Sequence, residues 1–125
     1  MKLLAITVNF RTPDMTLDAV RALMPELSGL SSKVVIVDND SQDGSYEKMQ
    51  AALEQESWGE QVVLLDPGHN GGFGYGNNCG MRLGFASDDP PEYVYLLNSD
   101  AFPDPGAIAT LVRFLDENPS AGIAG

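Results

Sequence analysis

Apolar runs without alternation recur along the chain and predict buried strands. They cover residues 3–8, 34–37, 61–65 and 93–97. Continuous apolar runs of this length are typical of strands that are covered on both faces of a parallel sheet. A further run at 121–124 is expected to begin a fifth strand. Between these runs, apolar residues recur at helical spacing, and each such stretch predicts a helix with one buried face.

Capping residues and prolines set the expected ends of the helices. Helices are expected from Thr12-Pro13, from about 46 to 55, from about 76 to 86, and from Asp104-Pro105 to Asn118-Pro119. Pro25 is expected to kink or shorten the first of them, because proline lacks the amide hydrogen that a helix interior needs.

The strict alternation of strands and helices predicts an α/β fold with a mainly parallel sheet and helices on both faces. We expect residues 1–125 to form a single domain, and the unfinished fifth strand predicts a sheet that continues beyond residue 125. In such sheets the ligand binds beyond the carboxyl ends of the strands. The polar loops at 9–11, 38–45, 66–78 and 98–104 follow the four strands, so candidate site residues are sought there.

Composition excludes several function classes. The chain has 125 residues, 43% of them hydrophobic, and a net charge of −11. This charge argues against nucleic acid as a partner, because phosphates need facing cations. The single cysteine, Cys79, precludes an internal disulfide, and one histidine argues against a Cys/His zinc site. No signal peptide or transmembrane segment is apparent, so the expected compartment is the cytoplasm.

The loop after the second strand contains three carboxylates within six residues, in the segment Asp38 to Asp43. Asp43-Gly44-Ser45 also fits a turn with a helix cap, so part of this loop has a structural explanation. Asp38 differs because it lies where the strand leaves the sheet. A carboxylate at this point accepts hydrogen bonds from a base N–H or a ribose hydroxyl.

The loop after the third strand is rich in glycine, with four glycines between His69 and Asn78. Glycine permits close approach of a backbone to a ligand, and the free N–H groups of a following helix suit an anion such as a diphosphate. The spacing is wrong for a dinucleotide fingerprint, which also follows the first strand, so an NAD site is not supported. A purely structural glycine loop is the alternative.

Asn98-Ser99-Asp100 follows the fourth strand. Mg²⁺ and Mn²⁺ prefer oxygen ligands and often take only one or two carboxylates, with water and phosphate completing the shell. A helix-capping turn explains the same triplet, but its position at a strand end favours a metal-bound diphosphate.

Taken together, the loops resemble those of family 2 glycosyltransferases, particularly rhamnosyltransferase-like members. The resemblance is carried by Val8-Asn9-Phe10, Val35 to Ser45, Asn70 to Asn78, Leu96 to Asp100 and Pro105-Gly106-Ala107. It implies a Rossmann-like GT-A fold, of which this chain is the N-terminal nucleotide-sugar-binding half. It also implies inverting transfer of a sugar from a nucleoside diphosphate sugar (dTDP-, UDP- or GDP-linked) to an acceptor hydroxyl, on a glycan or a lipid-linked acceptor in cell-surface polysaccharide or cell-wall synthesis.

The same resemblance assigns roles to residues. Val8, Asn9 and Phe10 would line the nucleobase pocket, and Asp38 would contact the base or ribose. Further contacts to the nucleotide sugar are expected from Asp40, Asn70, Gly71, Asn78, Asn98 and Ser99. Asp100 would bind the divalent metal, Mg²⁺ or Mn²⁺, at the position of the family's Asp-Xaa-Asp signature. The first Asp of that signature is Asn98 here, so the metal would depend mainly on Asp100.

The resemblance places the catalytic base in an acceptor-binding half beyond Gly125, and the sequence offers no candidate for it. We therefore expect this segment alone to bind nucleotide without turnover, and peripheral attachment to the inner face of the membrane would reside in the missing part. A noncatalytic nucleotide-sugar-binding module is the main alternative. A nucleotidyltransferase would need a basic glycine-rich loop after the first strand, and a receiver domain an acidic pair there; neither is present.

Overall fold

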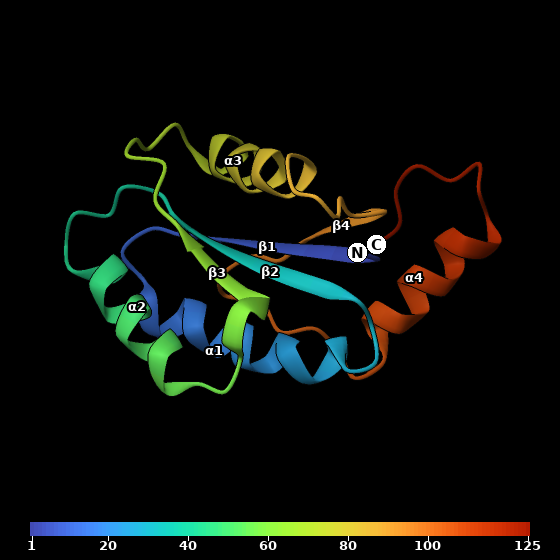
Figure 1. The fold of residues 1–125 in the computed structure, drawn as a ribbon, viewed down its shortest axis with the longest axis horizontal. Coiled ribbons are helices and arrows are strands. Elements are labelled where there is room, and N and C mark those ends of the chain that lie inside the picture. Colours follow the sequence, from blue (N-terminus) through green and yellow to red (C-terminus); the bar gives the residue numbers. More distant parts are fainter.

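Four apolar segments form one sheet, and all neighbouring strands run parallel. A computed structural model describes residues 1–125. The strands are β1 (Leu3–Asn9), β2 (Ser32–Asp38), β3 (Val62–Leu65) and β4 (Tyr93–Leu96), in the order β3-β2-β1-β4 (Figure 1). Ala5 of β1 pairs with Val34 on one side and Tyr95 on the other. The predicted parallel α/β sheet is confirmed.

Helices cover both faces of the sheet, as predicted. The α-helices are α1 (Pro13–Leu23), α2 (Ser45–Gln55), α3 (Phe73–Phe85) and α4 (Ala107–Glu117), with short 3-10 turns η1 (Met24–Leu27) and η2 (Gly59–Gln61). Figure 1 shows α3 alone over one face and α1 and α2 against the other, with α4 beside the end of α1. None of the helices combines the length and apolar character that a membrane crossing requires.

Alternate residues of β1 serve two separate hydrophobic cores. Leu3 and Ala5 join a cluster with α1 and α2, which also includes Ile108 of α4. Leu4, Ile6 and Val8 point to the α3 side. Because successive strand residues face opposite sides, a strand covered on both faces must be apolar at nearly every position. The uninterrupted run at 3–8 therefore follows from the layered fold.

Glycines on α3 allow that helix to approach the sheet closely. Gly76, Gly80 and Gly84 recur every four residues and so share one helix face. A Cβ atom built on Gly80 would lie 2.9 Å from Cγ2 of Ile6, and the other two would meet Val8 and Leu4 at 2.9 and 2.3 Å. A methyl group at any of these positions would require the facing side chain or the helix to shift. This glycine face had no counterpart in the sequence predictions.

Several element boundaries differ from the predictions. Helix α1 ends at Leu23, and Pro25 lies in η1, so proline shortens the helix rather than kinking it. Helix α3 begins at Phe73, three residues before the predicted start. Helix α4 begins at Ala107 after Gly106, whose φ of 79° is left-handed, so the predicted cap at Asp104-Pro105 was misplaced.

The predicted fifth strand at 121–124 is wrong for the chain as described. These residues form no strand and pair with no other strand. The apolar run by itself was insufficient, because a strand is defined by the backbone hydrogen bonds that it exchanges with a neighbour.

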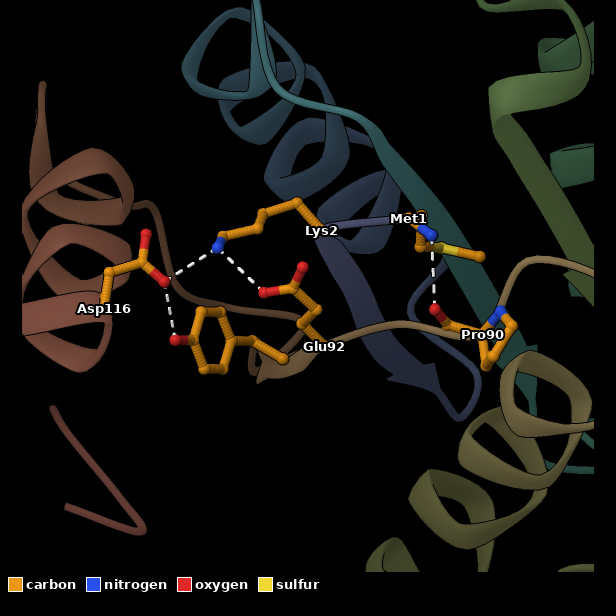
Figure 2. A network of polar contacts seen from close by, with 6 residues as sticks. Met1, Lys2, Pro90, Glu92 and Asp116 are labelled. Atoms are coloured by element: carbon orange, nitrogen blue, oxygen red, sulfur yellow. Dashed lines mark hydrogen bonds and ion pairs between the residues drawn. The ribbon is translucent and has the colours of Figure 1, made fainter. Parts of the chain in front are cut away.

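A cluster of charged groups joins the amino ends of β1 and β4 to α4. Lys2 Nζ lies 2.8 Å from Oε2 of Glu92 and 2.7 Å from Oδ1 of Asp116 (Figure 2). The hydroxyl of Tyr93 donates to the same Asp116 oxygen at 2.7 Å. These hydrogen bonds, chiefly that from Lys2, hold the pKa of Asp116 below its ordinary value. The hydrogen bond to Asp116 correspondingly raises the pKa of Tyr93.

Candidate functional site

A cleft of about 530 Å³ opens at the carboxyl end of the sheet. Each of the four strands contributes to it through its last residues or the loop that follows, as the rule for ligand sites in open α/β sheets requires. Its walls are formed by Val8, Phe10, Thr12, Met15, Asn39, Asn70, Gly72, Phe73, Asn98, Ser99 and Asp100. The loops that the sequence singled out therefore meet at a single site.

A buried polar network lies at the ends of β1 and β2. The Asn9 side chain is completely buried, and its Nδ2 donates to Oδ1 of Asp38 at 2.9 Å. The Ser41 hydroxyl donates to the same Asp38 oxygen at 2.6 Å, and the Thr16 hydroxyl donates to Oδ1 of Asn9 at 2.7 Å. Buried polar groups are costly unless they are paired. This network therefore fixes the start of α1 and the loop after β2 relative to the strand ends.

The rest of the loop after β2 is held by its own polar side chains. Asp40 adopts a left-handed φ of 58°, and its two carboxylate oxygens each accept a hydrogen bond from Nε2 of Gln42 at 3.1 Å. Asp43 accepts hydrogen bonds from the hydroxyl and backbone N–H of Ser45 at the start of α2. The bond from the Ser45 hydroxyl lowers the pKa of Asp43. Asp43 thus closes a turn onto Ser45, which is the first residue of α2, while the N-cap position is Gly44 and carries no side-chain capping hydrogen bond.

The glycine-rich loop turns sharply before α3. Gly72 directly precedes the helix and has a φ of 96°, a value that residues other than glycine rarely adopt. Its N–H donates to Oδ1 of Asn70 at 2.9 Å, and the same oxygen accepts Nδ2 of Asn39 at 3.0 Å. Gly71 is required for another reason, since a Cβ there would lie 2.4 Å from the Tyr75 ring. The amino end of α3 is thereby directed at the cleft.

Asn98, Ser99 and Asp100 form a turn on the cleft wall. The carbonyl of Asn98 accepts the N–H of Ala101 at 3.0 Å, which closes the turn, and the Asn98 and Asp100 side chains are exposed. The triplet presents a carboxylate, an amide oxygen and a hydroxyl. These hard oxygen donors suit Mg²⁺ or Mn²⁺.

The sequence model of glycosyl transferase family 2 matches residues 5–125, nearly the whole chain. The chain belongs to glycosyltransferase family 2. No curated protein matches it significantly.

A solved glycosyltransferase shares the fold. The chain is similar to the mannosyltransferase PcManGT from Pyrobaculum calidifontis, solved in complex with GDP-Man and Mn²⁺, with a TM-score of 0.75 and 20% sequence identity. The match covers 91% of this chain and 32% of the mannosyltransferase. This family 2 chain therefore has a Rossmann-like GT-A fold and spans about a third of the length of that relative.

Six of the eleven residues predicted for the site line the cleft of this family 2 chain. They are Val8, Phe10, Asn70, Asn98, Ser99 and Asp100. Asn9 and Asp38 are buried behind the wall, with exposed fractions of 0% and 2%. Asp40, Gly71 and Asn78 lie in the neighbouring loops and on α3 but are not part of the lining.

The structure adds five lining residues that the sequence reading did not assign to the site: Thr12, Met15, Asn39, Gly72 and Phe73. Asn39 and Gly72 lie in the polar loops after β2 and β3, which the sequence analysis had already selected as candidate site segments, so a role at the site could have been predicted for them. Thr12 was interpreted only as a helix cap, yet its side chain makes no capping hydrogen bond. Nothing in the pattern around Met15 separates it from other exposed helix residues.

The donor set tests whether a divalent metal fits this site. No three His, Cys, Asp or Glu side chains gather anywhere in the chain, so a metal held entirely by such side chains is not supported. An ion at Asp100 would have one carboxylate, with Asn98 and Ser99 oxygens nearby and diphosphate and water as its other ligands. Mg²⁺ and Mn²⁺ sites on phosphate substrates commonly have this composition. The residues fit the metal that the family resemblance implies.

Proposed function

We propose that the chain binds a nucleoside diphosphate sugar in the cleft and forms the donor-binding half of an inverting glycosyltransferase. The observation that carries this proposal is the convergence of Asn98-Ser99-Asp100, the amino end of α3 and the end of β1 on one cleft. These three parts offer oxygen ligands for a cation, free backbone N–H groups for an anion, and an apolar surface for a base. A metal-bound diphosphate joined to a nucleoside needs all three.

Distinct parts of the donor would contact distinct walls. Phe10, with 44% of its surface exposed, offers an aromatic face for the nucleobase beside Val8. The first turn of α3 leaves backbone N–H groups free, and its dipole favours the negative diphosphate. Asn70 would contact the sugar nucleotide from the cleft wall. Contact of Gly71 and Asn78, which lie outside the lining, stays a prediction. Contact of Asp38 or Asp40 with the base or ribose stays a prediction.

Asp100 would hold the cation on the diphosphate, with Asn98 and Ser99 beside it. Bound Mg²⁺ or Mn²⁺ supplies Lewis-acid stabilisation of the negative charge on the leaving diphosphate. Transfer also requires a base for the acceptor hydroxyl. Asp100 is the only carboxylate on the cleft wall, and a carboxylate that coordinates a cation is a poor base. We therefore expect this chain to bind the donor without turnover, with the base in the acceptor-binding part.

The donor classes consistent with this site are dTDP-, UDP- and GDP-linked sugars, and a rhamnosyltransferase-like enzyme is the subtype that we propose. That PcManGT was solved with GDP-Man and Mn²⁺ supports a nucleotide-sugar donor and a divalent cation. The acceptor would be a glycan or a lipid-linked glycan in polysaccharide or cell-wall synthesis. Such an enzyme would act in the cytoplasm or at the inner face of the membrane.

Calorimetric titration with UDP-, dTDP- and GDP-sugars, with and without Mn²⁺, tests the proposal. We expect Mn²⁺ to strengthen binding of one nucleotide class and Asp100→Ala to lose that gain, because the substitution removes the only carboxylate at the cation. The matched control is Asp88→Ala, in the exposed turn before β4. Equal metal-dependent binding by both variants would exclude Asp100 as the ligand, and absence of all nucleotide binding would reject the function.

A noncatalytic nucleotide-sugar-binding module is the second candidate, favoured by the single carboxylate on the cleft wall. The two candidates differ in one measurement, sugar transfer by a longer form that carries an acceptor-binding part. The transferase proposal expects transfer that Asp100→Ala abolishes. If the chain is a noncatalytic module, the longer form should bind nucleotide as strongly as the transferase proposal expects but should transfer no sugar.

A further inference from the structure

Asn39 connects the sheet to the glycine-rich loop. It follows Asp38 at the end of β2, and its backbone N–H donates to the carbonyl of Asn9 at 2.8 Å. Its side chain lies on the cleft wall, although only 3% of the residue is exposed. The position of Asn39 is therefore set by the two central strands.

Both hydrogens of the Asn39 amide are used to hold the loop. Nδ2 donates to Oδ1 of Asn70 at 3.0 Å and to the carbonyl of Gly72 at 2.9 Å. These are the only side-chain hydrogen bonds between residues 66–72 and the rest of the chain. Since Gly72 precedes the first residue of α3, the same two bonds fix the direction of the helix's amino end.

The amide has only one favourable orientation. Its Oδ1 is buried without a partner, and the Cα of Gly76 packs so closely that a Cβ there would lie 3.4 Å from that oxygen. Rotating the amide by 180° would place its oxygen against two acceptors, Oδ1 of Asn70 and the carbonyl of Gly72. The loop thus requires a side chain at position 39 that donates two hydrogen bonds.

We propose that Asn39 is a positioning residue that holds the glycine-rich loop and the amino end of α3 in the geometry that receives the nucleotide sugar. The proposal deepens the function proposed above and rests on it. It predicts that donor affinity depends on the hydrogen-bond donors at position 39.

Asn39→Asp tests this with almost no change of shape. A carboxylate donates no hydrogen bond and repels the two loop oxygens. We therefore expect Kd to rise about tenfold at about pH 8 for whichever of the UDP-, dTDP- and GDP-sugars binds the wild type most tightly. Burial and the flanking Asp38 and Asp40 charges would raise the pKa of the new carboxyl group. Its protonated form donates one hydrogen bond, so the ratio of variant to wild-type Kd should fall towards unity near pH 5.

Taking the ratio of variant to wild-type Kd at each pH cancels the titrations that both proteins share. Asn118→Asp is the matched control, because Asn118 Nδ2 donates to the carbonyl of Phe114 at 2.8 Å at the far end of α4. We expect that control to keep wild-type affinity at every pH. An Asn39→Asp variant with wild-type Kd, or with a loss that does not recover on acidification, would overturn the proposal.

Amide hydrogen exchange without ligand gives a second readout. We expect the hydrogen-bonded N–H groups of Gly72 and Gly76 to exchange faster in Asn39→Asp than in Asn118→Asp, and unchanged protection would overturn the positioning role. If the wild-type chain binds no nucleotide while these exchange rates differ, the proposed function fails and the loop-holding contact stands. If Asn39→Asp does not fold, nucleotide affinity and amide exchange are measured instead on Asn39→Ser, whose side chain is neutral and donates one hydrogen bond.

Discussion

The polar residues at the strand ends divide by the direction in which their side chains point. Asn9 and Asp38, the last residues of β1 and β2, point inward and bond each other, whereas Phe10 and Asn39, the next residue after each strand, reach the cleft wall. This follows from the strand pleat, in which successive side chains point to opposite sides. The inward pair stabilises the strand ends, Phe10 is exposed in the cleft, and Asn39 holds the glycine-rich loop.

The buried network predicts a cost for removing the Asp38 carboxylate. Asp38→Ala leaves Nδ2 of Asn9 and the Ser41 hydroxyl without their acceptor, and we expect the free energy of unfolding to fall by about 1–3 kcal/mol. Asp38→Asn keeps an acceptor oxygen and should lose less. Urea denaturation measures both, with exposed Asp88→Ala as the control. A loss of the same size in all three variants would show that this network does not stabilise the fold.

At the scale of the element, α3 combines close packing with a role at the cleft. Its glycine face lies on Leu4, Ile6 and Val8, so the helix axis is closer to the sheet than side chains of ordinary size permit. Glycine lowers helix propensity by about 1 kcal/mol relative to alanine at each interior position. The close packing compensates for a helix that is intrinsically weak.

Two glycine-to-alanine variants on this helix should have opposite effects. A methyl group on Gly80 would lie 2.9 Å from Ile6, and overpacking of this kind costs about 1–3 kcal/mol, which exceeds the gain in helix propensity. Gly74 has open space around its Cα, so Gly74→Ala should stabilise the chain by up to about 1 kcal/mol. Thermal unfolding compares the two directly. A stabilised Gly80→Ala would mean that α3 packs more loosely than described.

The elements were largely predictable from the sequence, whereas side-chain directions were not. Continuous apolar runs identified all four strands because both faces of the sheet are covered. The start of α3 was missed because glycine signals both loops and close packing. The inward direction of Asn9 and Asp38 was missed because their partners, Thr16 and Ser41, become neighbours only after folding. Asn39 was missed for the same reason, since its partners lie 31 and 33 residues away.

At the scale of the whole molecule, α4 is held by polar contacts at both ends, to η1 at one and beside the sheet at the other. The N–H of Gly106 donates to Oε2 of Glu26 at 3.0 Å at one end, and the Lys2 cluster binds Asp116 near the other. Few α4 side chains are buried apart from Ile108. The polar contacts therefore matter more for this helix than for α1 or α3.

The lowered pKa of Asp116 predicts a pH-dependent contribution to stability. Its contacts with Lys2 and Tyr93 stabilise the fold fully above the ordinary Asp pKa of 3.8, and the contribution is lost as the pH falls through the lowered value. We expect Asp116→Asn to lower the melting temperature at neutral pH, with the difference from wild type shrinking as the pH falls below the ordinary Asp pKa of 3.8. The neighbouring Glu117→Gln serves as the control. A difference in melting temperature that does not change with pH would exclude the contacts of the ionised Asp116 carboxylate as its cause.

The close packing of α3 on β1 also bears on how the cleft could be enlarged. Val8 forms part of the cleft and touches Gly76, so one spacing governs both the compactness of the fold and the room left for a ligand. A larger residue at 76 would lift the start of the helix away from the strand. Enlarging the cleft for a bulkier ligand therefore begins at Gly76, where any gain in volume is expected to lower thermal stability.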